Sequence, residues 1–161
     1  MNKYFITFLF AIVSCTISAQ VNVNSKQLAG TTWKIIKPYD NSMEHRWSFS
    51  NKECRSFFIF RSKKSSELIK TYYLSQKDEQ FQHSKVGTAT SGCYLCYYNT
   101  KLKESSNWLI TYFDSQKGIL KVKGETRAQP GEILLGGETV TLTLQRISPE
   151  KLLYDTIGNQ A

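Results

Sequence analysis

Three cysteines are the residues whose type and spacing could support metal binding, redox chemistry or a disulfide. Cys93 and Cys96 have the C-x₂-C spacing seen in zinc knuckles and redox-active thiol pairs, and Cys54 lies upstream. The pair lies in a β-rich run, where residues three apart face opposite sides and lie about 10 Å apart. A disulfide needs Cα atoms within about 7 Å. We therefore expect a disulfide between Cys54 and one of the other two, or else three buried thiols.

Few other residues support metal binding or catalysis. His83 with Cys93 and Cys96 is the best set of metal-type ligands, but two thiols on one strand do not easily chelate one ion. His45 and His83 lie outside any nucleophile motif, and the sequence contains no Gly-x-Ser-x-Gly. The carboxylates are scattered without a recognisable pattern. We expect no catalytic residue, no metal and no cofactor, and hence a protein that is not an enzyme.

Tyrosines gather in the middle of the chain and are the best candidates for a binding site. Adjacent tyrosines in a strand point to opposite sides, so one of each pair is expected to face inwards. Inward hydroxyl groups in an otherwise apolar cavity would fix the polar end of a small ligand. The alternative is that these rings serve only core packing. The residues predicted to line the cavity are Tyr73, Tyr94, Tyr97 and Tyr112.

The elements that must position these side chains are β-strands. Val140, Leu142 and Leu144 alternate with polar residues, which is the period-two pattern of a half-buried strand. Residues 114–118 separate two apolar runs and predict a hairpin turn. Residues 75–84 read as a polar loop with at most a short helical turn. Strands are predicted at 31–37, 44–50, 55–61, 67–74, 92–99, 108–113, 119–123, 132–135 and 140–147.

The number and spacing of these strands predict the fold. Eight or nine short strands separated by turns are typical of an all-β protein. An antiparallel up-and-down barrel of about eight strands removes exposed sheet edges, and we expect that architecture, with a β-sandwich as the alternative. The chain has 161 residues, which suits one domain over residues 20–161.

The first nineteen residues read as a signal peptide that precedes this domain. A short basic start is followed by an apolar run over residues 4–13, too short to cross a bilayer, and by small residues before Gln20. Export to the periplasm, the outer membrane or the medium is the expectation. Residues 12–15 also resemble a bacterial lipobox, in which Cys15 would carry the lipid, so removal and lipidation both remain open.

The net positive charge of the chain indicates which kinds of partner it could bind. The chain has 21 Lys and Arg against 13 Asp and Glu, a formal net charge of +8. An exported protein rarely meets nucleic acid, so we expect no nucleic-acid partner. Anionic surface lipids or acidic glycans are the more plausible partners, and the membrane is expected to be reached only through the lipid anchor. The plain alternative is a solvated polar face that keeps the protein soluble.

Two short segments carry a family resemblance. Gly30 and Trp33 open the domain and Arg146 closes it, a pattern similar to that of lipocalin-like, calycin-type barrels. The resemblance implies that Trp33 lies at the closed end of a barrel with Arg146 packed across it. It also implies an exported, non-catalytic binding protein that holds a small apolar or amphipathic ligand. The alternative is a cell-surface interaction protein with a filled barrel that binds glycan or protein.

Overall fold

The computed structural model describes residues 21–38, 43–61, 63–125 and 138–148. They form an all-β structure with one short helix and one turn of 3-10 helix, η1 (His83–Lys85). No helix in these four ranges is long and apolar enough to cross a membrane. The helix is α1 (Ser25–Leu28), and the strands are β1 (Val23–Asn24), β2 (Thr32–Lys37), β3 (Glu44–Phe49), β4 (Glu53–Phe60), β5 (Lys63–Lys64), β6 (Leu68–Ser75), β7 (Ser91–Gly92), β8 (Tyr94–Asn99), β9 (Glu104–Asp114), β10 (Ile119–Glu125) and β11 (Thr139–Arg146).

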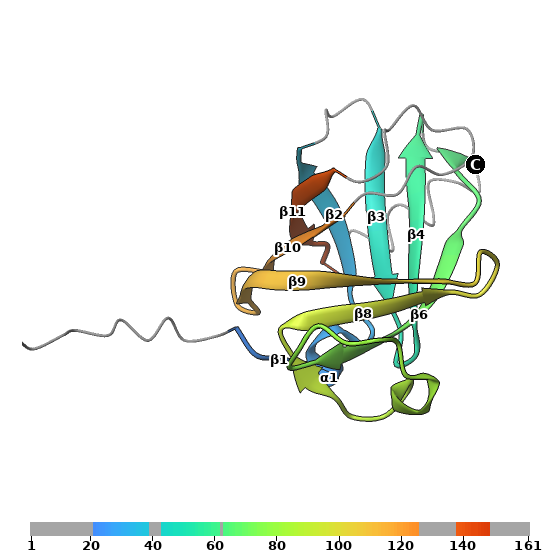
Figure 1. Cartoon of the computed structure of the whole chain (residues 1–161). Helices are drawn as coiled ribbons and strands as arrows, with labels where there is room; N and C mark the ends of the chain where they lie inside the picture. The colour runs from blue at the N-terminus through green and yellow to red at the C-terminus, as the bar shows by residue number, and fades with distance from the viewer. Residues whose placement is uncertain (1–20, 39–42, 62, 126–137, 149–161) are drawn as a thin grey trace, which may run out of the picture.

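Eight of these strands close into an antiparallel up-and-down barrel. Its neighbours run in the order β3, β2, β11, β10, β9, β8, β6 and β4, and pairing between β3 and β4 completes the ring. The two-residue strand β5 only extends the outer part of β4. Figure 1 shows β2, β3 and β4 upright and β8 and β9 running across the view, as strands on two sides of a tilted barrel do. The predicted barrel is confirmed.

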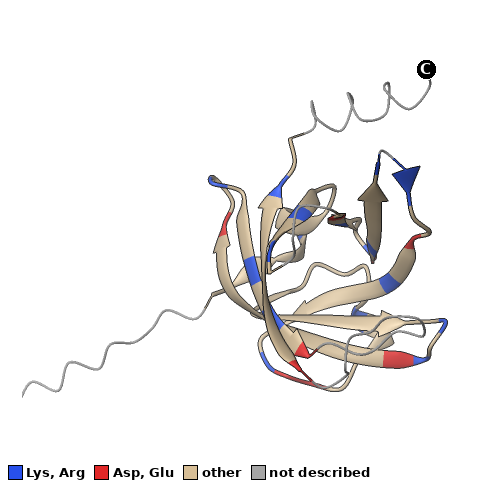
Figure 2. Cartoon of the chain, turned by 90° about the horizontal axis from the view of Figure 1, so that it is seen from above, with Lys and Arg blue, Asp and Glu red and all other residues tan. Residues whose placement is uncertain are grey.

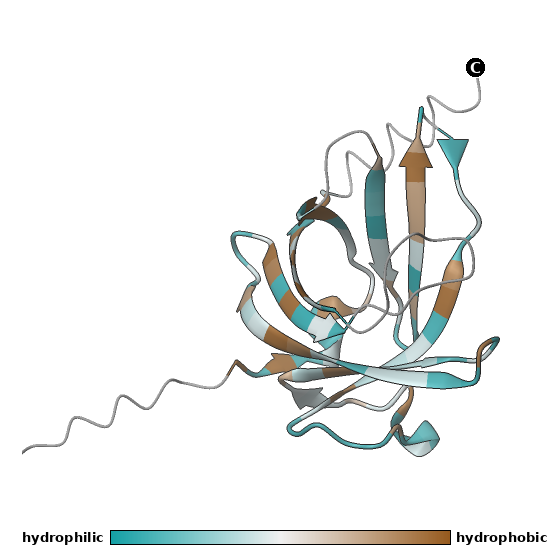
Figure 3. Cartoon of the chain, turned by 45° about the horizontal axis from the view of Figure 1, so that its top comes forward, coloured by the Kyte–Doolittle hydropathy of each residue, from teal (hydrophilic) through white to brown (hydrophobic). Residues whose placement is uncertain are grey.

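Strand alternation decides which side chains fill the barrel. On β10, Leu120, Val122 and Gly124 are buried, whereas Lys121 and Lys123 between them are exposed. The brown and teal bands of Figure 3 make this alternation visible along the wall. Burial of the apolar face drives closure, since about 25 cal/mol is gained for each Å² of apolar surface removed from water. Of the lysines and arginines in the described ranges, only Arg46 is buried, so the others stay in contact with water; Figure 2 shows in blue where they lie along the ribbon.

The chain before β2 closes one end of the barrel. Asn24 caps α1 by accepting from the Lys26 amide, and its own amide donates to the Gln27 side chain. This capping box makes a helix of only four residues possible. Leu28 and Val23 are fully buried in the core as a result. No helical periodicity occurs in these residues, so α1 was not predicted.

Residues 76–90 cross the outer face of β6 and β8, and we call them the strap. The Tyr73 hydroxyl accepts from the Gln82 amide at 3.1 Å, and the Asn107 side chain donates to the Glu79 carbonyl at 2.7 Å. Phe81 stacks on Tyr98 with ring centroids 5.3 Å apart. The strap therefore buries an outer face of the barrel that would otherwise be solvated. It was predicted as a polar loop, and its only regular element is η1.

Most predicted strands are present with shifted bounds. The run at 92–99 divides into β7 and β8, and the strand predicted at 108–113 extends over residues 104–114. The turn at 114–118 is confirmed, with the Asp114 carboxylate accepting from the Gln116 and Lys117 amides at 3.0 and 2.8 Å. The strand predicted at 132–135 and the signal peptide at 1–19 lie outside the described residues.

Candidate functional site

The barrel interior is filled at the end closed by α1. Phe49, Leu74 and Leu95 are at most 2% exposed there, beside Leu28 of the helix. Trp33 is fully buried, and its indole donates to the Thr31 hydroxyl at 2.7 Å. This part of the interior holds side chains only, so a ligand site inside the barrel has to lie toward the other end.

From the filled end, the inner face of the barrel continues to polar and less buried side chains. Cys54 pairs with Phe49 across β3 and β4 and with Lys70 across β4 and β6, so the three side chains share the inner face. His45 and Phe58 are also directly paired, two residues farther along the same face than Trp47. We call His45, Cys54, Phe58, Lys70 and Tyr97 the mouth cluster. Cys54 and Tyr97 belong to the buried core, whereas Lys70, His45 and Phe58 are half-buried.

Aromatic rings surround the charged and polar groups of the mouth cluster. His45 stacks on Phe58 with ring centroids 4.2 Å apart and an interplanar angle of 25°. The Lys70 ammonium lies 5.5 Å from the Tyr97 ring centroid, within the range of a cation–π interaction. Trp47 packs edge-on against Tyr97 at 5.9 Å. The result is a cationic group held among rings, which is suited to an amphipathic molecule.

Trp108 lies on the opposite wall of the interior and depends on a glycine. A Cβ on Gly124 would lie 2.4 Å from the Trp108 ring, far inside van der Waals contact. Trp108 is half-buried and packs edge-on against Trp47 at 5.7 Å. Gly124 therefore makes room for an indole that narrows the barrel above the filled end.

Burial sets the protonation of the mouth cluster. Loss of hydration and, to a smaller extent, the nearby positive charge of Lys70 together lower the pKa of His45 to about 4. His45 is neutral at pH 7 as a consequence. Burial raises the pKa of the Cys54 thiol to about 12, so this thiol is protonated and a poor nucleophile. Burial also raises the pKa of Tyr97 well above its ordinary value. These three side chains are therefore uncharged at pH 7.

The four tyrosines predicted to line a cavity are not brought together. Tyr97 faces the interior, 2% exposed, and its hydroxyl has no hydrogen bond. Tyr73 is buried on the outer face beneath the strap, where Lys85 lies 5.4 Å from its ring. Tyr94 is half-buried on β8, two residues from Cys96 on the same outer face. Tyr112 is 39% exposed on the outside of β9.

The three cysteines of the domain are buried thiols. None of them forms a disulfide in the described structure. Cys54 faces the interior, whereas Cys96 lies beneath the strap, so the barrel wall separates their side chains. The Cys93 thiol lies 3.7 Å from the Gln76 carbonyl. The structure thus corresponds to the alternative of three reduced cysteines.

The structure also shows where the three residues of the lipocalin-like sequence pattern, Gly30, Trp33 and Arg146, lie. Trp33 and Arg146 are direct partners across β2 and β11. Trp33 is fully buried, whereas the Arg146 side chain is exposed. Gly30 has a φ of +74°, the left-handed region that favours glycine, and its amide donates to the Phe49 carbonyl at 2.8 Å. The three residues lie at the end of the barrel that α1 closes.

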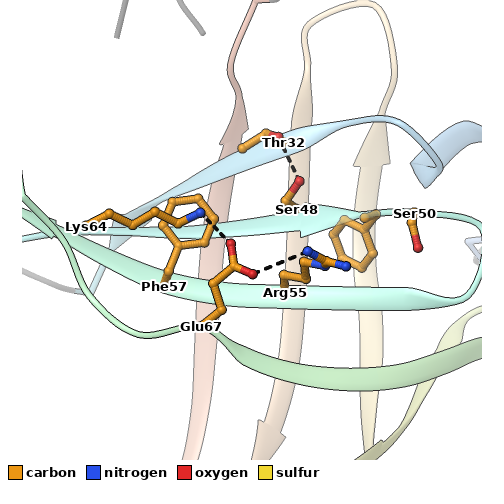
Figure 4. Close-up of a pocket in the computed structure, with 8 residues that line it drawn as sticks. Thr32, Ser48, Ser50, Arg55, Phe57, Lys64 and Glu67 are labelled. Carbon is orange, nitrogen blue, oxygen red and sulfur yellow. Dashed lines mark hydrogen bonds and ion pairs between the residues drawn. The ribbon is translucent and has the colours of Figure 1, made fainter. Parts of the chain in front are cut away.

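A shallow groove of about 400 Å³ lies on the outer face of β3 and β4 (Figure 4). Glu67 accepts from Arg55 at 3.4 Å and pairs with Lys64, whose hydrogen bond lowers the pKa of the carboxyl. The Lys64 ammonium lies 4.1 Å from the centroid of the Phe57 ring. Because Glu67 and Glu53, which also pairs with Arg55 at 3.0 Å, together balance the two cations, the groove has no strong preference for an anion.

Sequence reasoning did not single out Lys70 and His45 as site residues. Lys70 alternates with Tyr72 and Leu74 on one strand, and this spacing was the available signal for an inward lysine. No group of three metal-type ligands occurs in the described residues. Comparisons with protein-family models, with curated proteins and with solved structures find no match.

Proposed function

We propose that the protein is a non-catalytic carrier for a small amphipathic molecule with an acidic head group. The observation that carries the proposal is the inward, half-buried Lys70 among aromatic rings at the less filled end of the barrel. The acidic group would lie beside the Lys70 ammonium, and the apolar part would pack against Phe58 and Trp108. Neutral His45 beside Lys70 adds no second charge to this region.

The barrel architecture supports a lipocalin-like assignment as part of this proposal. Lipocalin-like barrels are closed by up-and-down strands around a ligand cavity. The strand order, the helix at one end and the pairing of Trp33 with Arg146 agree with that type. The exposed Arg146 is the feature that fits least, since the resemblance implies an arginine packed across the indole.

A titration with a fluorescent fatty-acid probe, 11-(dansylamino)undecanoic acid, tests the carrier proposal. We expect wild type to bind the probe, and Lys70→Met to weaken binding about tenfold because a charge-assisted contact is lost. Lys121→Met is the matched control, since Lys121 points outward from β10 and should leave the affinity unchanged. A probe whose carboxylate is converted to the neutral amide should bind wild type and Lys70→Met alike. Equal affinity of the acidic probe for all three proteins would contradict a role for Lys70.

The second candidate is a cell-surface interaction protein that binds glycan or protein on its outside. The filled half of the interior and the outer groove beside Phe57 favour it. If neither wild type nor any variant binds the acidic or the neutral probe, this second function takes precedence.

Export of the protein is part of the same proposal. It depends on residues 1–19 and on Cys15, which lie outside the described residues. The intact mass of the protein made by a lipidating bacterial host distinguishes a chain that begins at Gln20 from one that begins at lipidated Cys15. A chain that retains Met1 would contradict both forms of export.

A further inference from the structure

Three large apolar side chains are exposed at neighbouring strand ends at the mouth of the barrel. Ile36, Met43 and Phe60 are 39%, 46% and 47% exposed, and we call them the rim patch. Ile36 is the extra residue of a β-bulge near the end of β2, where β11 pairs with its two neighbours. Met43 precedes β3, and Phe60 ends β4. Because Glu44 pairs with Ile59, the start of β3 and the end of β4 are adjacent.

Positively charged side chains border the rim patch. Arg61 lies 5.1 Å from the centroid of the Phe60 ring, and Lys63 pairs with Phe60 across β4 and β5. Lys37 follows Ile36 and is exposed. In the ranges that the structure describes, no carboxylate forms an ion pair with Lys37, Arg61 or Lys63. Figure 2 shows β5 entirely in blue, and Figure 3 shows the end of β4 in brown beside it.

The β8–β9 hairpin places another exposed apolar residue bordered by lysines at the end of the barrel that carries the rim patch. Successive strands are antiparallel, so the turn between β8 and β9 lies at the end where β4 finishes. Leu102 at its tip is 47% exposed and lies between the exposed Lys101 and Lys103. Apolar side chains bordered by lysines and arginines therefore occur on two sides of the mouth.

We propose that the mouth of the barrel docks on a membrane containing anionic lipid. Exposed Ile, Met and Phe side chains gain free energy by entering the interfacial region of a bilayer. Unpaired lysines and arginines around them are attracted by anionic head groups, each contributing separately. Because the positive charges around the rim patch complement anionic head groups, we expect docking on an anionic membrane rather than on a neutral one. The inference extends the proposed carrier function, since a mouth placed on the bilayer would receive its ligand there, but it rests on the rim residues alone.

Vesicle flotation tests the proposal directly. The chain is used from Gln20 onward, because the apolar run at 4–13 would itself partition into lipid and every described strand is retained. Vesicles of phosphatidylcholine alone are compared with vesicles that also contain phosphatidylglycerol. We expect binding only to the second kind, and its loss at about 1 M salt, where the screening length is about 3 Å.

Substitutions in and beside the rim patch distinguish docking through this patch from nonspecific adsorption to lipid. Ile36→Ser combined with Met43→Ser should weaken binding to phosphatidylglycerol vesicles more than about tenfold, and Lys37→Gln with Lys63→Gln should weaken it and reduce its salt dependence. The matched control is Tyr112→Ser, because Tyr112 is similarly exposed with Lys121 at 5.4 Å from its ring, but lies on the outer wall. The control should bind as wild type does. Thermal unfolding confirms that each variant is folded.

The outcomes distinguish docking from ligand binding. Ile36→Ser with Met43→Ser should still bind the fatty-acid probe in solution, and Lys70→Met should still bind vesicles. Equal vesicle binding by wild type and both rim variants would overturn the docking proposal and leave the carrier proposal standing. A dimer in solution that the rim variants convert to monomer, without vesicle binding, would overturn docking and assign the patch to a second copy of the chain.

Discussion

At the scale of single residues, the mouth cluster combines chemistry that a plain hydrophobic core does not need. A lysine and a histidine face inward beside a buried tyrosine, although polar groups in an apolar interior lower stability unless they are satisfied. Lys70 and His45 can be tolerated because this end of the interior is only half-buried. The mouth cluster therefore lowers the stability of the fold, and it also supplies groups that could contact a ligand.

His45 makes stability depend on pH. Its pKa is lowered by burial and by Lys70 to about 4, whereas an unperturbed histidine has a pKa of 6.5. As the pH falls below 6.5, His45 becomes protonated in the unfolded chain, whereas in the folded chain it stays neutral until about pH 4. The free energy of unfolding should thus decrease over this window, by up to about 3 kcal/mol. Urea unfolding at several pH values measures it.

A variant isolates the contribution of this histidine. His45→Phe retains a ring against Phe58 and should remove the decrease between pH 6.5 and 4.5. Glu67 and Glu79, whose pKa values are lowered by hydrogen bonds from Lys64 and Lys85, lose their contribution as the pH falls below 4.5. An identical pH profile for wild type and His45→Phe would show that His45 is not the group responsible.

At the scale of elements, the strap and the barrel wall share one interface. Cys96 is fully buried, and burial raises the pKa of its thiol to about 11. The strap covers this thiol and is held by the Asn107 side chain, which donates to Asp78 and to the Glu79 carbonyl. The accessibility of Cys96 thus reports how firmly the strap is attached.

Removal of the Asn107 amide should loosen the strap. Asn107→Ala loses two hydrogen bonds, one of them to a carboxylate, so local opening should become at least about tenfold more frequent. The rate at which a thiol reagent labels Cys96 measures this opening. Cys54 inside the barrel is the internal reference, and Ser105→Ala on the same face of β9 is the control variant. Equal acceleration at Cys54 would indicate global rather than local unfolding.

The contact between β10 and Trp108 gives a second prediction at this scale. Gly124→Ala should lower the free energy of unfolding by about 1–3 kcal/mol, because the new methyl group overlaps the indole. Lys123→Ala, next to it but exposed, should change stability little. The loss should be smaller when Trp108→Leu is combined with Gly124→Ala than the two single losses added together. A fully additive double variant would contradict the contact.

Period-two alternation predicted most strands, because a half-buried strand must repeat every two residues. It could not tell which face of β6 and β8 is the inner one. Tyr72 and Tyr73 are both buried, one in the core and the other beneath the strap. A polar loop that packs on the outer face through a few aromatic rings leaves no periodic signal. For the same reason Tyr73 could be mistaken for a cavity residue, whereas Lys70 was overlooked.

At the scale of the whole molecule, the barrel has two unlike ends. One is filled and closed by α1, and the other carries the mouth cluster and, at its edge, the rim patch. Ligand binding and membrane docking would then use the same end, with the inner wall recognising the head group and the rim patch recognising lipid. The closed end provides the stability that the polar mouth lacks.

Paired native and denaturing mass spectra of the purified protein test the carrier function most directly. The account predicts a native mass that exceeds the denatured mass by one discrete small molecule, or, for protein purified empty, a single added molecule when dodecanoic acid is supplied. Lys70→Met should carry less of it under the same conditions. Equal native and denatured masses, before and after addition of dodecanoic acid, would contradict the carrier function.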